Sequence, residues 1–535
     1  MDTTKRQYTS KKMQSDHKRI AIIGAGLSGL LASKYLVQRG LDPVVFESYG
    51  QIGGIWKRGA VESTKLQTPK NFYQFTDFPW PEKVADTFPD HRQVAEYLDS
   101  YAEEFGLLPR IQFHRKVTEM NFLGKEHEAA TWSEWGGSSE AFSSEGKWNL
   151  TVEDSLDPSA PLEVYEVDFV ILCVGMFSGL PNIPDFPVNE GPEVFCGKVI
   201  HSMDYAMMGP ENAAKFIKGK RVTVVGFHKS AVDIAAEVAK CNGMSWQVNT
   251  ISTMLPDNLV KFAFGNLTRF KECLIHKPYE GLLLWILATL LSPLVGSKYI
   301  YLRWKYPLKK YGTLPEHSLG KQFRSCVTPT MPAHFYDAVE EGSLILRKSS
   351  SFSFCRNGLI MEGEMARFYP TDIVIFATGF KGDEKLRNMF VSTFFQKCIV
   401  GSSAPLYREI IHPRIPQVAI LGYLESFSVL HTTEMRSKWL AHFLTGGFKL
   451  PSIREMEGNL ANWERSAKRN SKESCKQYRL SAQLQIYCND LLCRDMKCNP
   501  RRKNWFLPEL FSTYGPADYR DLKPACSRED SLDLE

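Results

Sequence analysis

Three glycines near the N-terminus, Gly24, Gly26 and Gly29, have the spacing of a turn that binds the pyrophosphate of a dinucleotide. In such a turn the first glycine allows a tight reversal, the second lets the backbone approach a phosphate, and the third permits a helix to pack closely on a strand. Ser28 lies within the turn, and Glu47 follows at the distance where a carboxylate accepts hydrogen bonds from ribose hydroxyls. These residues predict a first dinucleotide site.

A second turn of the same kind begins at Gly226, but His228 takes the place of its second glycine and Ala231 the place of its third. A side chain at position 228 would push a pyrophosphate outward, although His228 or Lys229 could offset this by donating hydrogen bonds to phosphate. Ser230 could cap the following helix or bind a phosphate. The chain is therefore expected to bind two dinucleotides, one held tightly and one exchanging.

Each turn needs a buried strand before it and a helix after it, and the sequence supplies both. Short β-branched runs at 20–23 and 222–225 precede the turns, and apolar helical stretches follow them. Two further segments, DFVILCVG at 168–175 and DIVIFATG at 372–379, are typical of strands that end in a glycine at the ligand-binding edge of a sheet. The expected fold class is α/β, with two Rossmann-like dinucleotide-binding domains.

The positions of these segments predict that one dinucleotide domain is inserted into the other, because the second glycine turn lies between the two strand–glycine segments. The first domain is expected to take residues 19–190 and to resume at 365–515. The second domain is expected to take residues 191–364, with a helical insertion. Polar tails are expected at 1–18 and at 516–535.

The composition excludes several classes of protein. The chain has 535 residues, of which 43% are hydrophobic and 23% charged, so it is not a disordered, collagen-like or coiled-coil protein. A formal net charge of +5 over this length does not call for nucleic acid as a partner. The 12 cysteines form no C-x-x-C pair and lack the spacing of zinc ligands, so no metal site and no redox dithiol is expected. We expect reduced thiols in a cytoplasmic protein.

The most apolar stretch of the chain, at 282–294, is too short to span a bilayer and contains a proline. It precedes a basic and aromatic stretch at 299–310. Two interpretations of residues 281–310 stay open. They form either an interfacial membrane helix or substrate-channel wall, or a buried helix pair in an inserted subdomain. No transmembrane span is expected under either interpretation, whereas contact with a membrane surface belongs only to the first.

Residues 195–205 read FCGKVIHSMDY and match FxGxxxHSxxY, the signature of the flavin-containing monooxygenases. The resemblance covers roughly residues 19–515. Other segments that are similar to the family are GGIW at 53–56, DFPWP at 77–81 and ATGF at 377–380. The chain most resembles the plant branch that includes N-hydroxypipecolate synthase, through KLQ at 65–67, GFHKSAVD at 226–233 and HTTEMRSKWL at 431–440.

The resemblance implies a specific oxygenation chemistry. NADPH would reduce bound FAD, the reduced flavin would take up O2 as a C4a-hydroperoxide, and a soft nucleophilic atom would attack the distal oxygen. The main interpretation is N-hydroxylation of a small amine or amino acid. Two alternatives stay open: S-oxygenation of a thioether, and a flavin-binding protein whose NADPH turnover is impaired by the altered second turn.

The resemblance also assigns residues to the two cofactors. Gly53, Gly54 and Trp56 would form a turn against the flavin, although Trp56 could equally be a core aromatic residue. The residues implied in cofactor binding are Gly24, Gly26, Ser28, Gly29, Glu47, Gly53, Gly54, Trp56, His201, Tyr205, Gly226, His228, Lys229, Ser230, Thr378 and Gly379.

Several positions distinguish this chain within the family. Gln67 is the candidate catalytic residue, because it falls where many animal members carry an asparagine near the flavin, and its amide could hydrogen-bond the oxygenating group or NADP+. Tyr205 favours heteroatom oxygenation, since the Baeyer–Villiger signature ends in tryptophan there. His201 is expected at the interface of the two domains. The arginine that commonly binds the 2′-phosphate of NADPH is replaced by Asn249, and Lys229 could substitute for it.

Overall fold

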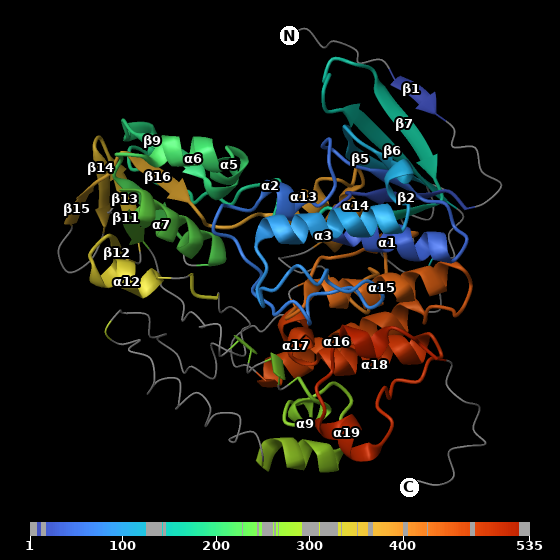
Figure 1. The fold of residues 1–535 in the computed structure, drawn as a ribbon. Coiled ribbons are helices and arrows are strands. Elements are labelled where there is room, and N and C mark those ends of the chain that lie inside the picture. Colours follow the sequence, from blue (N-terminus) through green and yellow to red (C-terminus); the bar gives the residue numbers. More distant parts are fainter. Residues whose placement is uncertain are drawn as a thin grey trace.

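The computed structural model describes residues 8–11, 18–124, 142, 146–226, 228–242, 245–248, 260–261, 264–265, 267–290, 310, 330–332, 334–349, 351–361, 367–399, 405–424, 426–470 and 477–523. Two α/β domains lie side by side, each built on a parallel sheet, and a group of C-terminal helices packs below the first domain in the view of Figure 1. This architecture confirms the expected fold class.

The first domain is built on a five-stranded parallel sheet in the order β17-β8-β2-β3-β4. Its strands are Ile20–Ile23 (β2), Val44–Phe46 (β3), Ile111–Gln112 (β4), Phe169–Leu172 (β8) and Val418–Ile420 (β17). Alternate side chains of β2 enter two different cores, because successive residues of a strand point to opposite faces. One core includes α1 (Leu27–Gln38) and α15 (Val429–Leu444), and the other includes Trp148 and Phe395.

A second sheet of the first domain covers that other core. It has the order β1-β7-β6-β5, with strands Tyr8–Lys11 (β1), Leu162–Val167 (β7), Lys147–Asp154 (β6) and Arg115–Leu123 (β5). The expected N-terminal tail is therefore wrong at 8–11, where β1 pairs in parallel with β7. An edge strand such as β7 presents unpaired backbone groups, and these bind the N-terminal segment.

The second domain is built on another five-stranded parallel sheet, in the order β12-β11-β10-β16-β9. Its strands are Lys198–His201 (β9), Val222–Val225 (β10), Ser245–Val248 (β11), Leu344–Arg347 (β12) and Ile373–Phe376 (β16). A small antiparallel sheet of Phe352–Cys355 (β13), Gly358–Met361 (β14) and Arg367–Pro370 (β15) adjoins it. The long helix α7 (Lys229–Asn242) follows β10, as the glycine turn predicts.

The expected boundary between residues 364 and 365 is wrong, because β15 and β16 belong to the second domain. The chain instead crosses between the domains near Pro181 and returns near Phe380, where the two segments form an antiparallel bridge. Both strand–glycine segments look alike in sequence because each lies beside the central strand of its own sheet. Their similarity therefore gives no sign of which sheet each one joins.

The remaining helices cover the sheets or form the C-terminal group. They are Ile55–Arg58 (α2), His91–Glu104 (α3), Ser202–Met207 (α5), Pro210–Ile217 (α6), Arg269–Glu272 (α9), Phe335–Glu340 (α12), Gly382–Arg387 (α13), Thr393–Cys398 (α14), Ile453–Asn470 (α16), Gln477–Gln483 (α17), Gln485–Asp495 (α18) and Phe506–Phe511 (α19), with short 3-10 helices at Leu108–Arg110, Pro192–Val194 and Pro516–Tyr519.

The start of the expected C-terminal tail is part of the folded structure. Tyr519 is buried, and its carbonyl oxygen accepts a hydrogen bond from the Lys438 ammonium at 2.8 Å. The prediction of a polar tail is therefore wrong for 516–523, because Tyr519 adds a large aromatic side chain to the core around α15. Residues 524–535 lie outside the described part of the chain.

Residues 282–290 form a helix, and every side chain in it except Ala288 is exposed. The interpretation of this stretch as part of a buried helix pair is therefore wrong for the described residues. The rest of the predicted segment, 291–309, lies outside them. Within the described ranges, no helix is both long enough and apolar enough to cross a bilayer.

Candidate active site

The first glycine turn lies where β2 meets β8, at the point where the strand order reverses direction. Gly24 has φ +104°, and a Cβ there would lie 2.6 Å from the carbonyl oxygen of Cys173 at the end of β8. A Cβ on Gly29 would lie 1.9 Å from the carbonyl oxygen of Gly24, so α1 approaches the turn as closely as a glycine allows. The turn and the close helix packing that the sequence predicts are both present.

A carboxylate and a second pair of glycines complete this first site. Glu47, at the end of β3, is buried, and its carboxylate accepts a hydrogen bond from the Ala25 N–H at 2.7 Å. The Gly53 N–H donates to the Ala25 carbonyl at 3.0 Å, and a Cβ on Gly54 would lie 3.3 Å from the Gly26 Cα. The site thus brings together the backbone of the two glycine turns, the N-terminus of α1 and a carboxylate. The backbone and the helix N-terminus fit the pyrophosphate of a dinucleotide, and the carboxylate fits its ribose.

Two contacts of this site could not be predicted from the sequence. A Cβ built on Gly422, whose φ is +75°, would lie 2.0 Å from the Ser28 hydroxyl oxygen, so the loop after β17 closes against the first turn. The Lys385 ammonium donates to the Val174 carbonyl at 2.6 Å, directly beyond β8. Burial lowers the pKa of Lys385 to about 8, against the opposing attraction of Glu47. Neither contact has a local signal, because each joins segments about two hundred or more residues apart.

Trp56, predicted to be either a flavin contact or a core aromatic residue, is half-buried. Its indole N–H donates to the Tyr73 hydroxyl at 3.0 Å, and the two ring centroids are 5.8 Å apart. Burial raises the pKa of Tyr73 well above its ordinary value, so the hydroxyl is neutral. The indole is thereby oriented by a polar contact, and its approach to the flavin stays a prediction.

Gln67 lies between the two domains. Its side-chain oxygen Oε1 accepts a hydrogen bond from the backbone N–H of Thr330, a residue that precedes α12 of the second domain, at 3.2 Å. The neighbouring Thr68 hydroxyl donates to the Phe427 carbonyl at 2.6 Å, in the loop that follows Gly422. The same loop therefore contacts both the first glycine turn and the segment that carries Gln67. Gln67 itself is exposed.

The first glycine of the second turn approaches the neighbouring strand as closely as Gly24 does in the first turn. Gly226 has φ +149°, and a Cβ there would lie 2.3 Å from the carbonyl oxygen of Ala377 at the end of β16. His228 is exposed at the start of α7, where its carbonyl accepts from the Val232 N–H at 3.2 Å. The histidine that replaces the second glycine thus lies at the helix N-terminus, where a phosphate is expected.

The cation predicted for a phosphate already has a partner within the chain. The Lys229 ammonium lies 2.7 Å from Oδ1 of Asp233, whose side chain is only 1% exposed. Burial raises the pKa of Asp233 to about 6, and Lys229 opposes that shift. Ser230 is exposed in the first turn of α7. Contact of Lys229 with a phosphate stays a prediction, and Asn249 lies outside the described residues.

His201 lies at the crossing between the domains. It is buried, its Nδ1 accepts from the Met203 N–H at 3.1 Å, and its Nε2 lies 3.0 Å from the Gly379 carbonyl oxygen. The ring is therefore a neutral imidazole with the proton on Nε2, and burial lowers its pKa. The Thr378 hydroxyl donates to the Asn182 carbonyl on the opposite crossing segment. His201, Thr378 and Gly379 thus fasten the two crossing segments.

Tyr205 takes part in a separate contact between the domains, through Glu237. It is buried, and its hydroxyl lies 3.3 Å from one carboxylate oxygen of Glu237 on α7. The other oxygen of Glu237 accepts from the Ser63 N–H of the first domain at 2.6 Å. Burial raises the pKa of Glu237. Glu237 was missed by sequence reasoning, because an acidic residue in a helical stretch gives no sign that it faces another domain.

Two glycine turns, each at the switch point of its own parallel sheet, define a protein of the two-dinucleotide α/β class. The profile of the family described as flavin-binding monooxygenase-like matches residues 17–501, and the chain belongs to this family. The probable flavin-containing monooxygenase 1 of Arabidopsis thaliana is 38% identical over 518 residues, which cover 94% of this chain and 96% of that protein. The predicted monooxygenase class and its FAD and NADPH cofactors are thereby confirmed.

Solved structures share the fold at low sequence identity. An oxidised steroid monooxygenase bound to NADP has a TM-score of 0.62 at 15% identity, over 91% of this chain and 97% of that one. The S-allyl-L-cysteine S-oxygenase from Allium sativum has a TM-score of 0.54 at 16% identity, over 91% and 89% of the two chains. These likenesses establish a common architecture for the two domains.

Proposed function

We propose that this monooxygenase hydroxylates the nitrogen atom of a small amine or amino acid. When bound, FAD reduced by NADPH would activate O2, one atom of which goes to the substrate and the other to water, and the protein binds and positions the reactants. The first glycine turn, Glu47 and the Gly53–Gly54 turn would hold FAD. The turn at Gly226 and the N-terminus of α7 would hold NADPH. The Tyr205–Glu237–Ser63 contact would hold the two dinucleotide sites in a fixed relative position.

The observation that carries the choice of a heteroatom over a carbon is Tyr205. The family's Baeyer–Villiger members, which insert oxygen into a C–C bond, end the signature in tryptophan, whereas here a tyrosine hydroxyl contacts the half-buried Glu237. The choice of nitrogen over sulfur rests on the resemblance to the plant branch, and S-oxygenation of a thioether is the competing outcome.

Gln67 supports an amino acid as the substrate. Thr330 occupies the amide oxygen of Gln67, so the amide nitrogen is the group that can donate a hydrogen bond to an oxygen atom between the domains. That oxygen could belong to a substrate carboxylate or to the activated oxygen. The matched variants Gln67→Asn and Gln67→Glu separate these functions, since the first retains a shorter donor and the second removes the donor and adds a charge.

The cysteines support a proposal for the cellular location. Among the described residues nine cysteines are free, and several are buried or half-buried. Unpaired thiols are typical of a reducing compartment. We propose a cytoplasmic protein that acts on a small molecule and O2.

Product analysis tests the proposed function. The flavin-loaded protein would receive NADPH, 18O2 and one of three substrates: a primary amine, a cyclic secondary amino acid, or a thioether amino acid. We expect one labelled oxygen on nitrogen, with NADPH consumption that depends on the amine. If sulfoxide is the sole product, the proposal of N-hydroxylation is rejected in favour of S-oxygenation. Flavin that NADPH fails to reduce would instead support the alternative of impaired turnover, through the altered turn at His228.

A further inference from the structure

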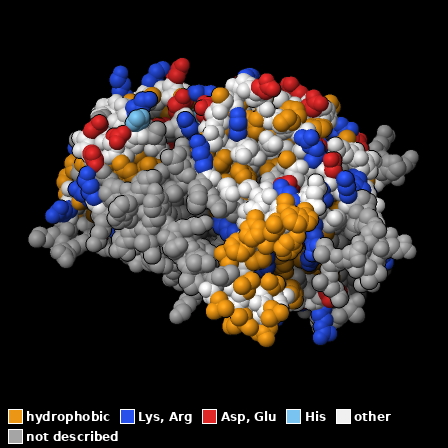
Figure 2. Space-filling view, turned by 60° about the horizontal axis from the view of Figure 1, so that its bottom comes forward, with side chains coloured by type: hydrophobic (Ala, Val, Ile, Leu, Met, Phe, Trp, Pro, Cys, Tyr) orange, Lys and Arg blue, Asp and Glu red, His pale blue; other side chains and the backbone are white. Residues whose placement is uncertain are grey.

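Large apolar side chains gather on the face that carries the C-terminal helices. In Figure 2 this face is turned forward, and hydrophobic side chains form its most prominent patch. Its most exposed members lie on the helix at 282–290 and on residues 505–511. They include Leu282 (73% exposed), Leu283 (83%), Leu290 (70%), Trp505 (66%), Phe506 (65%) and Phe511 (53%). A monomeric water-soluble protein rarely leaves so many neighbouring apolar side chains in water.

The two segments of this apolar surface carry a single ionisable side chain, Glu509. That carboxylate is turned inward, where it is buried and accepts a hydrogen bond from the Tyr514 hydroxyl at 2.5 Å. The Phe270 ring of α9 lies 5.1 Å from the Phe511 ring of α19, which joins the neighbouring helices into one surface. The outward face of 282–290 and 505–511 is thus free of ionisable groups, as a water-exposed helix usually is not.

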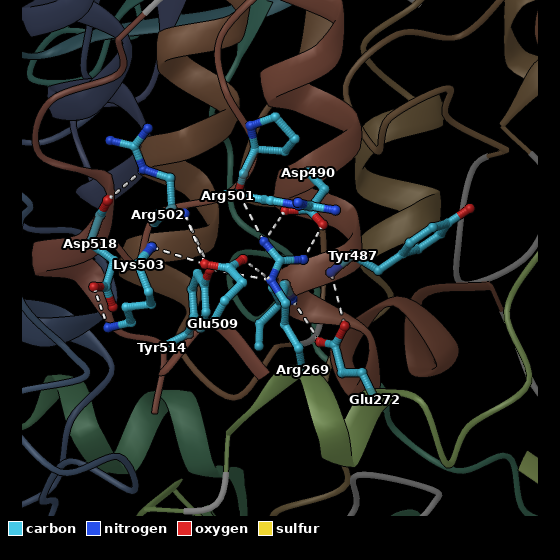
Figure 3. A network of polar contacts seen from close by, with 12 residues as sticks. Arg269, Glu272, Tyr487, Asp490, Arg501, Arg502, Lys503, Glu509, Tyr514 and Asp518 are labelled. Atoms are coloured by element: carbon cyan, nitrogen blue, oxygen red, sulfur yellow. Dashed lines mark hydrogen bonds and ion pairs between the residues drawn. The ribbon is translucent and has the colours of Figure 1, made fainter. Parts of the chain in front are cut away.

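A polar network beneath the surface fixes its position (Figure 3). Arg269 of α9 forms ion pairs with Asp490 of α18 and Glu509 of α19, and it donates to the Pro500 carbonyl at 2.8 Å. Glu272 accepts from the backbone N–H groups of Ile486 and Tyr487, at 2.7 and 2.9 Å, in the first turn of α18. These contacts satisfy the helix N-terminus and hold α9, α18 and α19 together.

The helix at 282–290 is also fastened at its N-terminal side. The Tyr487 hydroxyl donates to the Pro278 carbonyl at 3.0 Å, and Tyr279 contacts Asn459 and Asn462 of α16. The His276 and Trp285 rings lie 5.8 Å apart. The apolar helix is therefore held outward by the folded C-terminal group.

The pattern of exposure favours a bilayer over a second protein. Six successive side chains, from Leu282 to Leu287, are all exposed, and six residues cover more than one full turn of a helix. A protein partner at one interface covers one face of a helix, whereas a helix that is apolar on all sides is typical of a protein core or of a membrane environment. The tryptophans Trp285 and Trp505 are residues of the kind that favour this interfacial region.

Positive charge borders the apolar surface. Arg501 is exposed immediately before residues 505–511, and Lys277 precedes the helix at 282–290. We propose that the surface formed by 282–290 and 505–511 docks this protein on the anionic face of a lipid bilayer, without crossing it. The apolar side chains enter the interface, and the cations contact lipid headgroups.

Vesicle flotation of the full-length, flavin-loaded protein tests this docking. Vesicles of phosphatidylcholine alone are compared with vesicles that also contain phosphatidylserine. We expect the protein to float with the mixed vesicles, less with the neutral ones, and less again when salt is raised. The double variant Leu282→Asp/Leu283→Asp should lower the partition coefficient by about tenfold or more, because two apolar side chains leave the interface and two anions meet anionic lipid.

A matched control uses two exposed apolar side chains on other surfaces, Leu156 (73% exposed) and Val188 (88% exposed). Leu156→Asp/Val188→Asp adds the same charge and should float as the wild type does. Flavin content and thermal unfolding confirm that all variants are folded. The proposal is overturned if the wild type fails to float, or if both double variants float equally. It is also overturned if light scattering shows a dimer that Leu282→Asp/Leu283→Asp dissociates while no form binds vesicles.

Discussion

Replacing Gly26 with alanine separates the binding of FAD from the folding of the first domain. Gly26 has φ −74°, which any residue adopts, and a Cβ there would lie 3.7 Å from the Gly54 Cα, an ordinary contact. The protein alone therefore accommodates the methyl group. The methyl group would project from the backbone surface that should approach the pyrophosphate, so Gly26→Ala should fold normally and bind FAD weakly.

The expected magnitude follows from the hydrogen bonds at stake. If the methyl group displaces the pyrophosphate from one backbone N–H, the loss is about 1.5–3 kcal/mol, or roughly 10- to 150-fold in FAD affinity. Gly29→Ala should behave differently, since its Cβ would lie 1.9 Å from the Gly24 carbonyl oxygen. The helix or the turn must then shift, which should destabilise the protein without any ligand by roughly 3 kcal/mol.

The assay measures FAD affinity by flavin fluorescence on deflavinated protein, together with urea unfolding of the same samples. Gly458→Ala is the control, because this exposed helical glycine of α16 has open space around it. It should keep the FAD affinity and gain about 0.5–1 kcal/mol of stability. Wild-type FAD affinity in Gly26→Ala would refute the assignment of the pyrophosphate to this turn. Unfolding of Gly26→Ala would refute the packing argument.

Variants at three further positions test the second domain and its contacts. Glu237→Ala should destabilise the protein by about 1–3 kcal/mol because the buried Tyr205 hydroxyl and the half-buried Ser63 N–H lose their acceptor, whereas Glu237→Gln retains an acceptor and should cost less in urea unfolding. The Arg221 guanidinium holds the pKa of Asp372 down, to about 2, so this partly exposed pair stabilises the protein above about pH 4 and loses its effect as the pH falls toward about 2. Asp372→Asn should therefore lower the free energy of unfolding by under about 1 kcal/mol at neutral pH, and this difference from the wild type should disappear in acid. Burial raises the pKa of Asp233 to about 6 despite Lys229, so ionisation costs stability as the pH rises from about 4 through about 6. Asp233→Asn should lose less stability than the wild type over that range, and equal melting curves at every pH would contradict this.

The sequence predicted the features whose physical cause is local. Gly24 and Gly29 were located because a tight reversal and a close helix contact need glycine at a fixed spacing. The contact of Glu237 with Ser63 was not predicted, since it joins residues 174 positions apart. For the same reason, the sequence did not predict which sheet β16 joins, because its segment resembles that of β8. The helix at 282–290 was ambiguous because an apolar run is typical both of a buried helix and of a helix in contact with a membrane.

The paired crossing segments near Pro181 and Phe380 limit how the two domains can move. Because the Asn182 N–H donates to the Gly379 carbonyl and the Lys381 N–H to the Leu180 carbonyl, both at 2.9 Å, the two connections act as one strap. A strap of this kind permits rocking about a single axis and resists twisting. Any motion that widens the space around Gln67 would then also separate the turns at Gly24 and Gly226. A domain motion that admits a substrate would thus also change the alignment of the two nucleotides on which hydride transfer depends.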